Sequence, residues 1–153
     1  MSEVRFYHLQ RRSLEQTLPL LLQKVLERGL RAVVMAGSTE RVEALTQHLW
    51  TFDSASFLPH GSRRDGSAAD QPVWLTADAE NPNGAQVLVL TDGVDGSGAD
   101  LQGLGFVTVC DLFDGNDGAA VAAARERWRR CKSAGHDLTY WQQASQGGWE
   151  RKA

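Results

Sequence analysis

The sequence lacks the motifs on which most enzymatic sites are built. None of its three lysines stands in a phosphate-binding loop, and the patterns G-x-S-x-G, G-K-[ST] and H-E-x-x-H do not occur. There is also no H-x-E with a paired C-x-x-C, the pattern of a zinc deaminase. The four histidines are scattered, which favours structural or exposed roles (His8, His48, His60 and His136). We therefore predict a protein with no catalytic site and no cofactor of its own.

Cysteine is scarce, and long apolar runs are absent. Cys110 and Cys131 are far apart and form no C-x-x-C pattern, which favours two reduced, buried thiols and no metal site. No segment approaches the roughly 20 apolar residues of a membrane span, and residues 1–5 lack the apolar core of a signal peptide. These features predict a soluble, cytoplasmic protein that does not enter a membrane.

The chain of 153 residues is long enough for one globular domain with a substantial core, given its 42% hydrophobic content. Short apolar runs alternate with amphipathic segments, which predicts a single three-layer α/β/α domain with a largely parallel sheet over residues 1–141. A polar, frayed tail is expected at 142–153. Strands are expected at residues 4–9, 31–36, 72–76, 87–90, 106–112 and 137–141.

The first helix has two candidate starts. Ser13 with Gln16 forms a capping box, but a helix that begins there has Pro19 in its interior. With Thr17 as the cap, Pro19 falls in the first turn, where proline is tolerated. We therefore predict that the main helix begins at Leu18.

Two glycine-containing segments invite a nucleotide-binding interpretation. The turn Gly37-Ser38 joins a buried strand to a helix whose N-terminus could receive a phosphate. It has no lysine and no second glycine, so Ser38 is interpreted as a helix cap. Residues 92–105 contain five glycines without a G-x-G-x-x-G pattern and are predicted to be a loop. A nucleotide-dependent enzyme that uses Ser38 remains an alternative.

Residues 49–61 carry three large aromatic side chains, Trp50, Phe52 and Phe57, at the end of a predicted helix. An aromatic ring in a connecting segment either fills a core or faces a partner. Partner surfaces favour such rings because they bury a large area at little entropic cost. We expect at least one of the three to be exposed for binding.

Residues 119–134 form the most informative predicted helix. At about 100° per residue, Arg125, Trp128, Arg129 and Lys132 fall within about a third of its circumference. Small side chains form the neighbouring face, which packs on the sheet (Ala120, Ala124 and Cys131). A tryptophan beside three cations suits an acidic peptide with an apolar residue and a free carboxylate at its end, or single-stranded nucleic acid stacked on the ring. The net charge of −3 favours the peptide.

Five segments stand out together: Leu49-Trp50, Phe57-Leu58-Pro59-His60, Asn81-Pro82-Asn83-Gly84, Cys110-Asp111-Leu112-Phe113-Asp114 and Ala124-Arg125-Glu126-Arg127-Trp128-Arg129. In their order and separation they resemble the chi subunit family of the bacterial DNA polymerase III holoenzyme. The similarity spans nearly the whole chain.

The resemblance implies a non-catalytic adaptor of the clamp-loader complex, with a Rossmann-like, mononucleotide-binding type of fold whose nucleotide site is not used. The family links the psi subunit to the acidic C-terminal tail of single-stranded DNA-binding protein, so its contact with nucleic acid is mainly indirect. By position, Trp50 and Phe57 resemble the surface for psi, for which a repair helicase competes in some bacteria.

The same resemblance assigns the pocket for the acidic tail. Arg125, Trp128 and Arg129 correspond to it, with Phe113 as an apolar wall, and helical geometry adds Lys132. Trp128 stands where other members carry tyrosine, which keeps a ring but replaces the hydroxyl with an indole donor. The segment 92–105 and the chain beyond 141 vary in the family and carry no function over.

Overall fold

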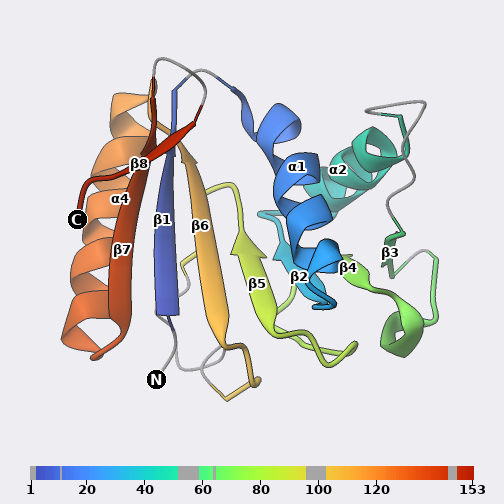
Figure 1. Ribbon diagram of the computed structural model, residues 1–153. Helices are drawn as coiled ribbons and strands as arrows, with labels where there is room; N and C mark the ends of the chain where they lie inside the picture. The colour runs from blue at the N-terminus through green and yellow to red at the C-terminus, as the bar shows by residue number, and fades with distance from the viewer. Residues whose placement is uncertain (1–2, 11, 52–58, 64, 96–102, 145–147) are drawn as a thin grey trace.

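The computed structural model of the chain describes residues 3–10, 12–51, 59–63, 65–95, 103–144 and 148–153. The helices are α1 (Leu14–Glu27), α2 (Thr39–Thr51) and α4 (Gly118–Ser133), with a short 3₁₀ helix η1 (Ala68–Asp70). The strands are β1 (Glu3–Leu9), β2 (Ala32–Met35), β3 (Gly61–Ser62), β4 (Val73–Thr76), β5 (Val87–Leu90), β6 (Thr108–Asp114), β7 (Asp137–Gln143) and β8 (Trp149–Arg151). Strands and helices alternate through β1, α1, β2, α2 and β3, whereas β4, β5 and β6 follow one another with no helix between them among the described residues (Figure 1).

The described strands form one sheet in the order β3-β4-β2-β5-β6-β1-β7-β8. Neighbouring strands are parallel except for β7 and β8, which are antiparallel. Every residue of β4 and β5 is buried, because helices or loops cover both faces of a parallel sheet. The prediction of an α/β fold with a largely parallel sheet is confirmed.

Helices α1 and α2 cover one face of the sheet, and α4 covers the other (Figure 1). On the first face, large apolar side chains of the two helices pack on the strands (Leu18, Leu22, Val25, Val42, Leu45 and Leu49). On the second face, α4 contributes the small Ala124 and Cys131, which join a cluster around Phe6. None of the helices in the described part of the chain is both long and apolar enough to cross a bilayer.

Helix α1 begins at Leu14, so the predicted start at Leu18 is wrong. Ser13 is the N-cap, and its Oγ accepts a hydrogen bond from the backbone N–H of Gln16. The side chain of Gln16 in turn accepts one from the Ser13 N–H, which completes the capping box. The two reciprocal bonds stabilise the early start despite the proline that follows.

Pro19 lies inside α1, where it cannot donate the helical hydrogen bond to the carbonyl of Glu15. That carbonyl is bonded by the Nε2 of His48, a residue of α2. The bond lost to the proline is thus replaced by a contact from the neighbouring helix. The local sequence contains no sign of this contact, because His48 is remote from α1 along the chain.

Two further predictions differ from the structure. The strand predicted at 106–112 is shifted to Thr108–Asp114, because its last residues pair with β1 (His8 with Phe113, Leu9 with Asp114). The tail predicted to be frayed contributes β8, in which Trp149 packs edge-on against Tyr7 with ring centroids 5.0 Å apart. In both segments, pairing with a neighbouring strand outweighs a local sequence typical of a turn or a loose end.

Candidate functional site

Helix α4 carries most of the residues that the sequence analysis assigned to ligand binding. It is capped by Asp117, whose Oδ1 accepts hydrogen bonds from the backbone N–H groups of Ala119 and Ala120 at 3.0 and 3.4 Å. Its inner face carries the small side chains of Ala124 and Cys131, each 2% exposed. Since these side chains are short, the helix packs directly on β1, β6 and β7.

The inner face of α4 also contains Arg127, which the sequence analysis did not identify. Its Nε and Nη2 donate hydrogen bonds of 2.7 and 3.0 Å to the Asp111 carboxylate in β6, and both side chains are 3% exposed. Burial raises the pKa of Asp111, and the bonds from Arg127 oppose that shift. The pair joins two of the segments that carry the family resemblance. Helical spacing contained the signal, because Arg127 falls between Ala124 and Cys131 on the buried face.

The outer face of α4 is basic. Arg125, Arg129 and Lys132 are all exposed on it. Arg129 forms an ion pair with Glu126 one turn earlier. Arg125 and Lys132 take part in no ion pair among the residues that the structure describes. These two cations are therefore the ones most available to an anionic ligand.

Trp128 lies at the border of the basic face and is half-buried. Its ring meets that of Phe6 edge-on, with centroids 5.4 Å apart, and that of Tyr140 in β7 at 5.9 Å. Phe6 is fully buried, so part of the indole belongs to the core. The exposed remainder forms an apolar wall beside the cations.

Phe113 lies beneath this wall and is only 5% exposed. Its ring packs against His8 at 5.2 Å and against Tyr140 at 6.0 Å. The hydroxyl of Tyr140 is 2.6 Å from the Nδ1 of His8, so the three side chains form one cluster. Phe113 therefore supports the wall from below through Tyr140. We call Arg125, Trp128, Arg129 and Lys132, with this cluster, the α4 site.

His8 and Tyr140 are site residues that were not predicted from the sequence. Strand alternation contains a signal for both, since Phe6 and His8 share one face of β1, and Leu138 and Tyr140 share one face of β7. Which face α4 would cover could not be read from the sequence, so the two residues were not assigned to the site.

Arg125 acts electrostatically on this cluster. Burial lowers the pKa of His8, and the positive charge of Arg125 lowers it further. Burial raises the pKa of Tyr140, and Arg125 opposes that effect. His8 is therefore favoured in its neutral form. The α4 site thus combines exposed guanidinium and ammonium groups for carboxylates with a half-buried aromatic wall for a ring.

Of the three aromatic residues in the predicted partner surface at the end of α2, the structure describes Trp50. Phe52 and Phe57 lie outside the described residues. Trp50 is 48% exposed, and its ring centroid is 4.5 Å from that of His60. His60 is buried, and its Nε2 donates to the Thr46 carbonyl at 3.1 Å. Trp50 therefore presents a large apolar surface that rests on an anchored histidine.

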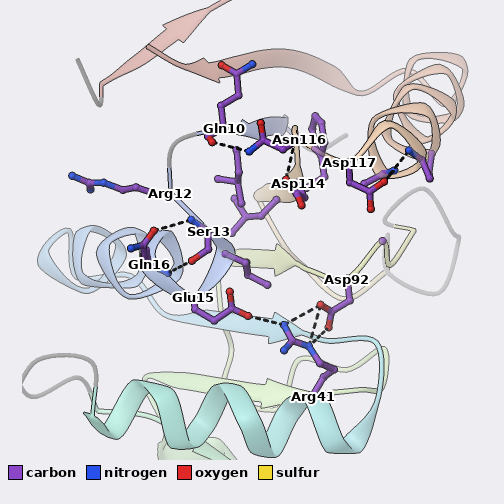
Figure 2. Close-up of a pocket in the computed structure, with 18 of the residues that line it drawn as sticks. Gln10, Arg12, Ser13, Glu15, Gln16, Arg41, Asp92, Asp114, Asn116 and Asp117 are labelled. Carbon is purple, nitrogen blue, oxygen red and sulfur yellow. Dashed lines mark hydrogen bonds and ion pairs between the residues drawn. The ribbon is translucent and has the colours of Figure 1, made fainter. Parts of the chain in front are cut away.

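A cleft of about 800 Å³ lies at the carboxyl ends of the parallel strands and is shown in Figure 2. From β1 the chain continues through α1 to β2, whereas from the adjacent β6 it continues through α4 to β7 on the other side. The cleft therefore lies at a topological switch point, where α/β folds of this kind bind nucleotides.

Most groups in this cleft that suit a phosphate are already engaged, although the exposed Arg12, which also lines it, forms no ion pair among the described residues. Ser13, which lines the cleft, caps α1. At the start of α2, the Oγ of Ser38 accepts a hydrogen bond from the Arg41 N–H at 3.2 Å, which confirms Ser38 as a helix cap. Arg41 is paired with the carboxylates of Glu15 and Asp92 (Figure 2). Occupied helix N-termini and lining carboxylates do not favour a nucleotide phosphate at this edge.

Comparison with known proteins agrees with the resemblance. The family model described as DNA polymerase III chi subunit, HolC, matches residues 1–139 of the chain. A protein of Rickettsia prowazekii (strain Madrid E) named "Probable DNA polymerase III subunit chi" is 30% identical over 95 residues. That stretch covers 62% of the present chain and 58% of the Rickettsia protein. The chain belongs to the DNA polymerase III chi subunit family.

Proposed function

We propose that this protein is a non-catalytic adaptor of the clamp-loader complex of DNA polymerase III. In this proposal it links the psi subunit to the C-terminal tail of single-stranded DNA-binding protein. Membership of the chi subunit family supports an accessory role in DNA replication. The two named partners rest on the chemistry of two surfaces, the α4 site and Trp50.

The observation that carries the proposal is the composition of the α4 site. Its exposed cations lie next to the half-buried ring of Trp128, in a chain whose net charge is −3. The tail of single-stranded DNA-binding protein offers aspartates and a terminal aromatic residue with a free carboxylate. Arginines bind such carboxylates with strong, oriented hydrogen bonds, and an indole edge suits the terminal ring. Arg125, which has no acidic partner among the described residues, is the principal anchor for these charges.

The second partner is assigned to Trp50. Exposed tryptophan is enriched where proteins bind one another, because it buries a large apolar area. Helices α2 and α4 cover opposite faces of the sheet (Figure 1), so a partner at Trp50 leaves the α4 site open. This separation suits an adaptor that binds two partners at once. A repair helicase that competes with psi would use the same surface.

The proposal is tested by calorimetric titration with the C-terminal tail peptide of the organism's own single-stranded DNA-binding protein. A second peptide without the last residue should not bind. Binding of the full peptide should weaken as salt rises and should be lost in Arg125→Glu. Arg63→Glu is the matched control, because Arg63 is exposed next to β3, at the far edge of the sheet from α4.

Other outcomes would point elsewhere. If Arg125→Glu bound the tail peptide as tightly as the wild type does, the assignment of the peptide to the α4 site would be wrong. Tight binding of a thymidine oligonucleotide with no protein partner present would favour a direct single-stranded DNA binder. Micromolar binding of ATP or NAD would favour a nucleotide-binding protein that uses the turn at Ser38.

A further inference from the structure

A groove on the α1 side of the sheet is separate from the α4 site and from Trp50, and it shares Arg12 with the cleft at the carboxyl ends of the strands. It encloses about 560 Å³ between α1 and the hairpin of β7 and β8. Figure 1 shows β1 and β6 between these elements, and their side chains Tyr7, Cys110 and Leu112 line its floor. Trp141 of β7 and Trp149 of β8 line one side. We call this the α1–β8 groove.

Helix α1 forms the other wall. Leu20, Lys24 and Arg28 recur at intervals of four residues and therefore form one stripe along the helix, all of it lining the groove. Leu20 is 41% exposed, although it is a large apolar side chain. An exposed leucine that continues a stripe of two cations and faces two tryptophans across a concavity is typical of a surface that a partner covers.

The groove is also strongly positive. Three cations that line it, Arg12, Lys24 and Arg28, form no ion pair among the residues that the structure describes. A fourth, Arg5, pairs with Glu3 of the same strand. The only carboxylate in the described lining is that of Glu27. This local excess of positive charge, on a chain with a net charge of −3, complements an anionic partner.

We propose that the α1–β8 groove binds an acidic peptide segment that places one large apolar side chain on the floor between α1 and Trp149. The apolar floor suits the anchor side chain, and the cations of the rim suit the flanking carboxylates. This occupant is independent of the α4 site, which lies on the opposite face of the sheet.

The aromatic geometry favours a peptide over single-stranded nucleic acid. Binding of single strands relies on open ring faces on which bases stack. Here Trp149 packs edge-on against Tyr7 at 5.0 Å, and the Nε1 of Trp141 is fixed by Thr139 at 2.9 Å. Both indoles are only half-exposed walls. Such walls suit an inserted side chain better than a stack of bases.

The test uses a fluorescein-labelled synthetic peptide of aspartate and glutamate around one central phenylalanine, with its C-terminus amidated. Amidation removes the terminal carboxylate that the α4 site would bind. Anisotropy titration should give saturable binding that falls by about tenfold in the double variant Lys24→Glu/Arg28→Glu. Both residues are exposed and make no bond that the fold requires, so the variant should remain folded. Arg125→Glu should bind this peptide as the wild type does.

A second measurement locates the peptide. The indole N–H resonances of Trp141 and Trp149, assigned with Trp→Phe variants, should shift on titration while that of Trp128 stays in place. A peptide with alanine for phenylalanine should bind more weakly by about tenfold. Unchanged affinity in Lys24→Glu/Arg28→Glu, or a shift confined to Trp128, would overturn the proposal. The proposal would also be overturned if a thymidine oligonucleotide bound and the peptide did not, and if that binding were lost in the same double variant. The groove would then be a site for single-stranded nucleic acid.

Discussion

Helices α1 and α4 lie on opposite faces of the same sheet (Figure 1), and different interactions hold them there. Helix α1 buries large apolar side chains, among them Leu18 and Leu22, which are fully buried. Helix α4 fully buries only small side chains and one charge, that of Arg127, which is paired with Asp111, while Trp128 is half-buried at the border. Apolar burial therefore dominates in α1, whereas α4 relies on a short, specific contact to the sheet.

This difference explains how α4 can carry a cationic surface. A helix with a wide apolar stripe leaves less of its circumference for polar residues. The narrow inner face of α4 leaves most of its surface for the cations of the α4 site. The buried Arg127–Asp111 pair fixes the orientation of that surface, because a bidentate pair tolerates little rotation.

The largest expected loss of stability comes from breaking the buried ion pair between Arg127 of α4 and Asp111. Arg127→Ala leaves the Asp111 carboxylate buried without its partner, which should lower the free energy of unfolding by about 3–5 kcal/mol in urea denaturation. Arg130→Ala is the control. Arg130 forms an exposed pair with Asp95, so its loss should cost less than about 1 kcal/mol. Similar values for the two variants would show that the buried pair does not orient α4.

The corresponding change in α1 removes apolar burial. Leu22→Ala deletes a fully buried side chain and should cost about 2–5 kcal/mol by the same measurement. Leu20→Ala, at an exposed position of the same helix, should be nearly neutral. If Leu22→Ala and Leu20→Ala lowered the free energy of unfolding equally, burial of the inner face would not be what stabilises α1.

Smaller losses of stability, similar for the two helices, are expected when the N-cap of α1 or of α4 is removed. Ser13→Ala removes the capping box of α1, and Asp117→Ala removes the cap of α4, each at a cost of about 1 kcal/mol. Thermal unfolding should therefore give similar destabilisation for the two. A much larger loss for Asp117→Ala would indicate that α4 depends on its cap more than the buried pair implies.

The smallest effect concerns the charge of His8. Its pKa in the folded protein is lowered by burial and then by Arg125, so the neutral ring contributes stability that is fully present above the unfolded-state pKa of about 6.5. That contribution is lost as the pH falls through the lower pKa of the folded state. An NMR titration should give a midpoint for His8 below its ordinary value.

Arg125→Gln should move this midpoint upward, because it removes a positive charge that disfavours protonation. Arg129→Gln is the control on the same helix and should leave the midpoint in place. A tail peptide bound at Arg125 should also raise the midpoint, since carboxylates favour the protonated ring. A midpoint of His8 that does not respond to Arg125→Gln would contradict the electrostatic link between them.

Periodicity and composition determined much of this protein. They were sufficient to predict the positions of most strands, the largely parallel sheet, the cap at Ser38 and the burial of Ala124 and Cys131 on α4, whereas Ala120, predicted on the same face, is only partly buried. Five short segments were also sufficient to indicate the family, which comparison with known proteins bears out. These features depend on residues that are close along the chain, so they can be read from it directly.

Tertiary structure decided the rest. Helix α1 starts early because a capping box and a contact from His48 outweigh Pro19, and Trp149 becomes part of a strand because it packs on Tyr7. Arg127 finds Asp111, and Tyr140 joins Trp128 to Phe113, across elements far apart in sequence. Each of these contacts depends on which face of the sheet a helix covers. The order of residues alone leaves that choice open, and the strand order with its crossovers decides it.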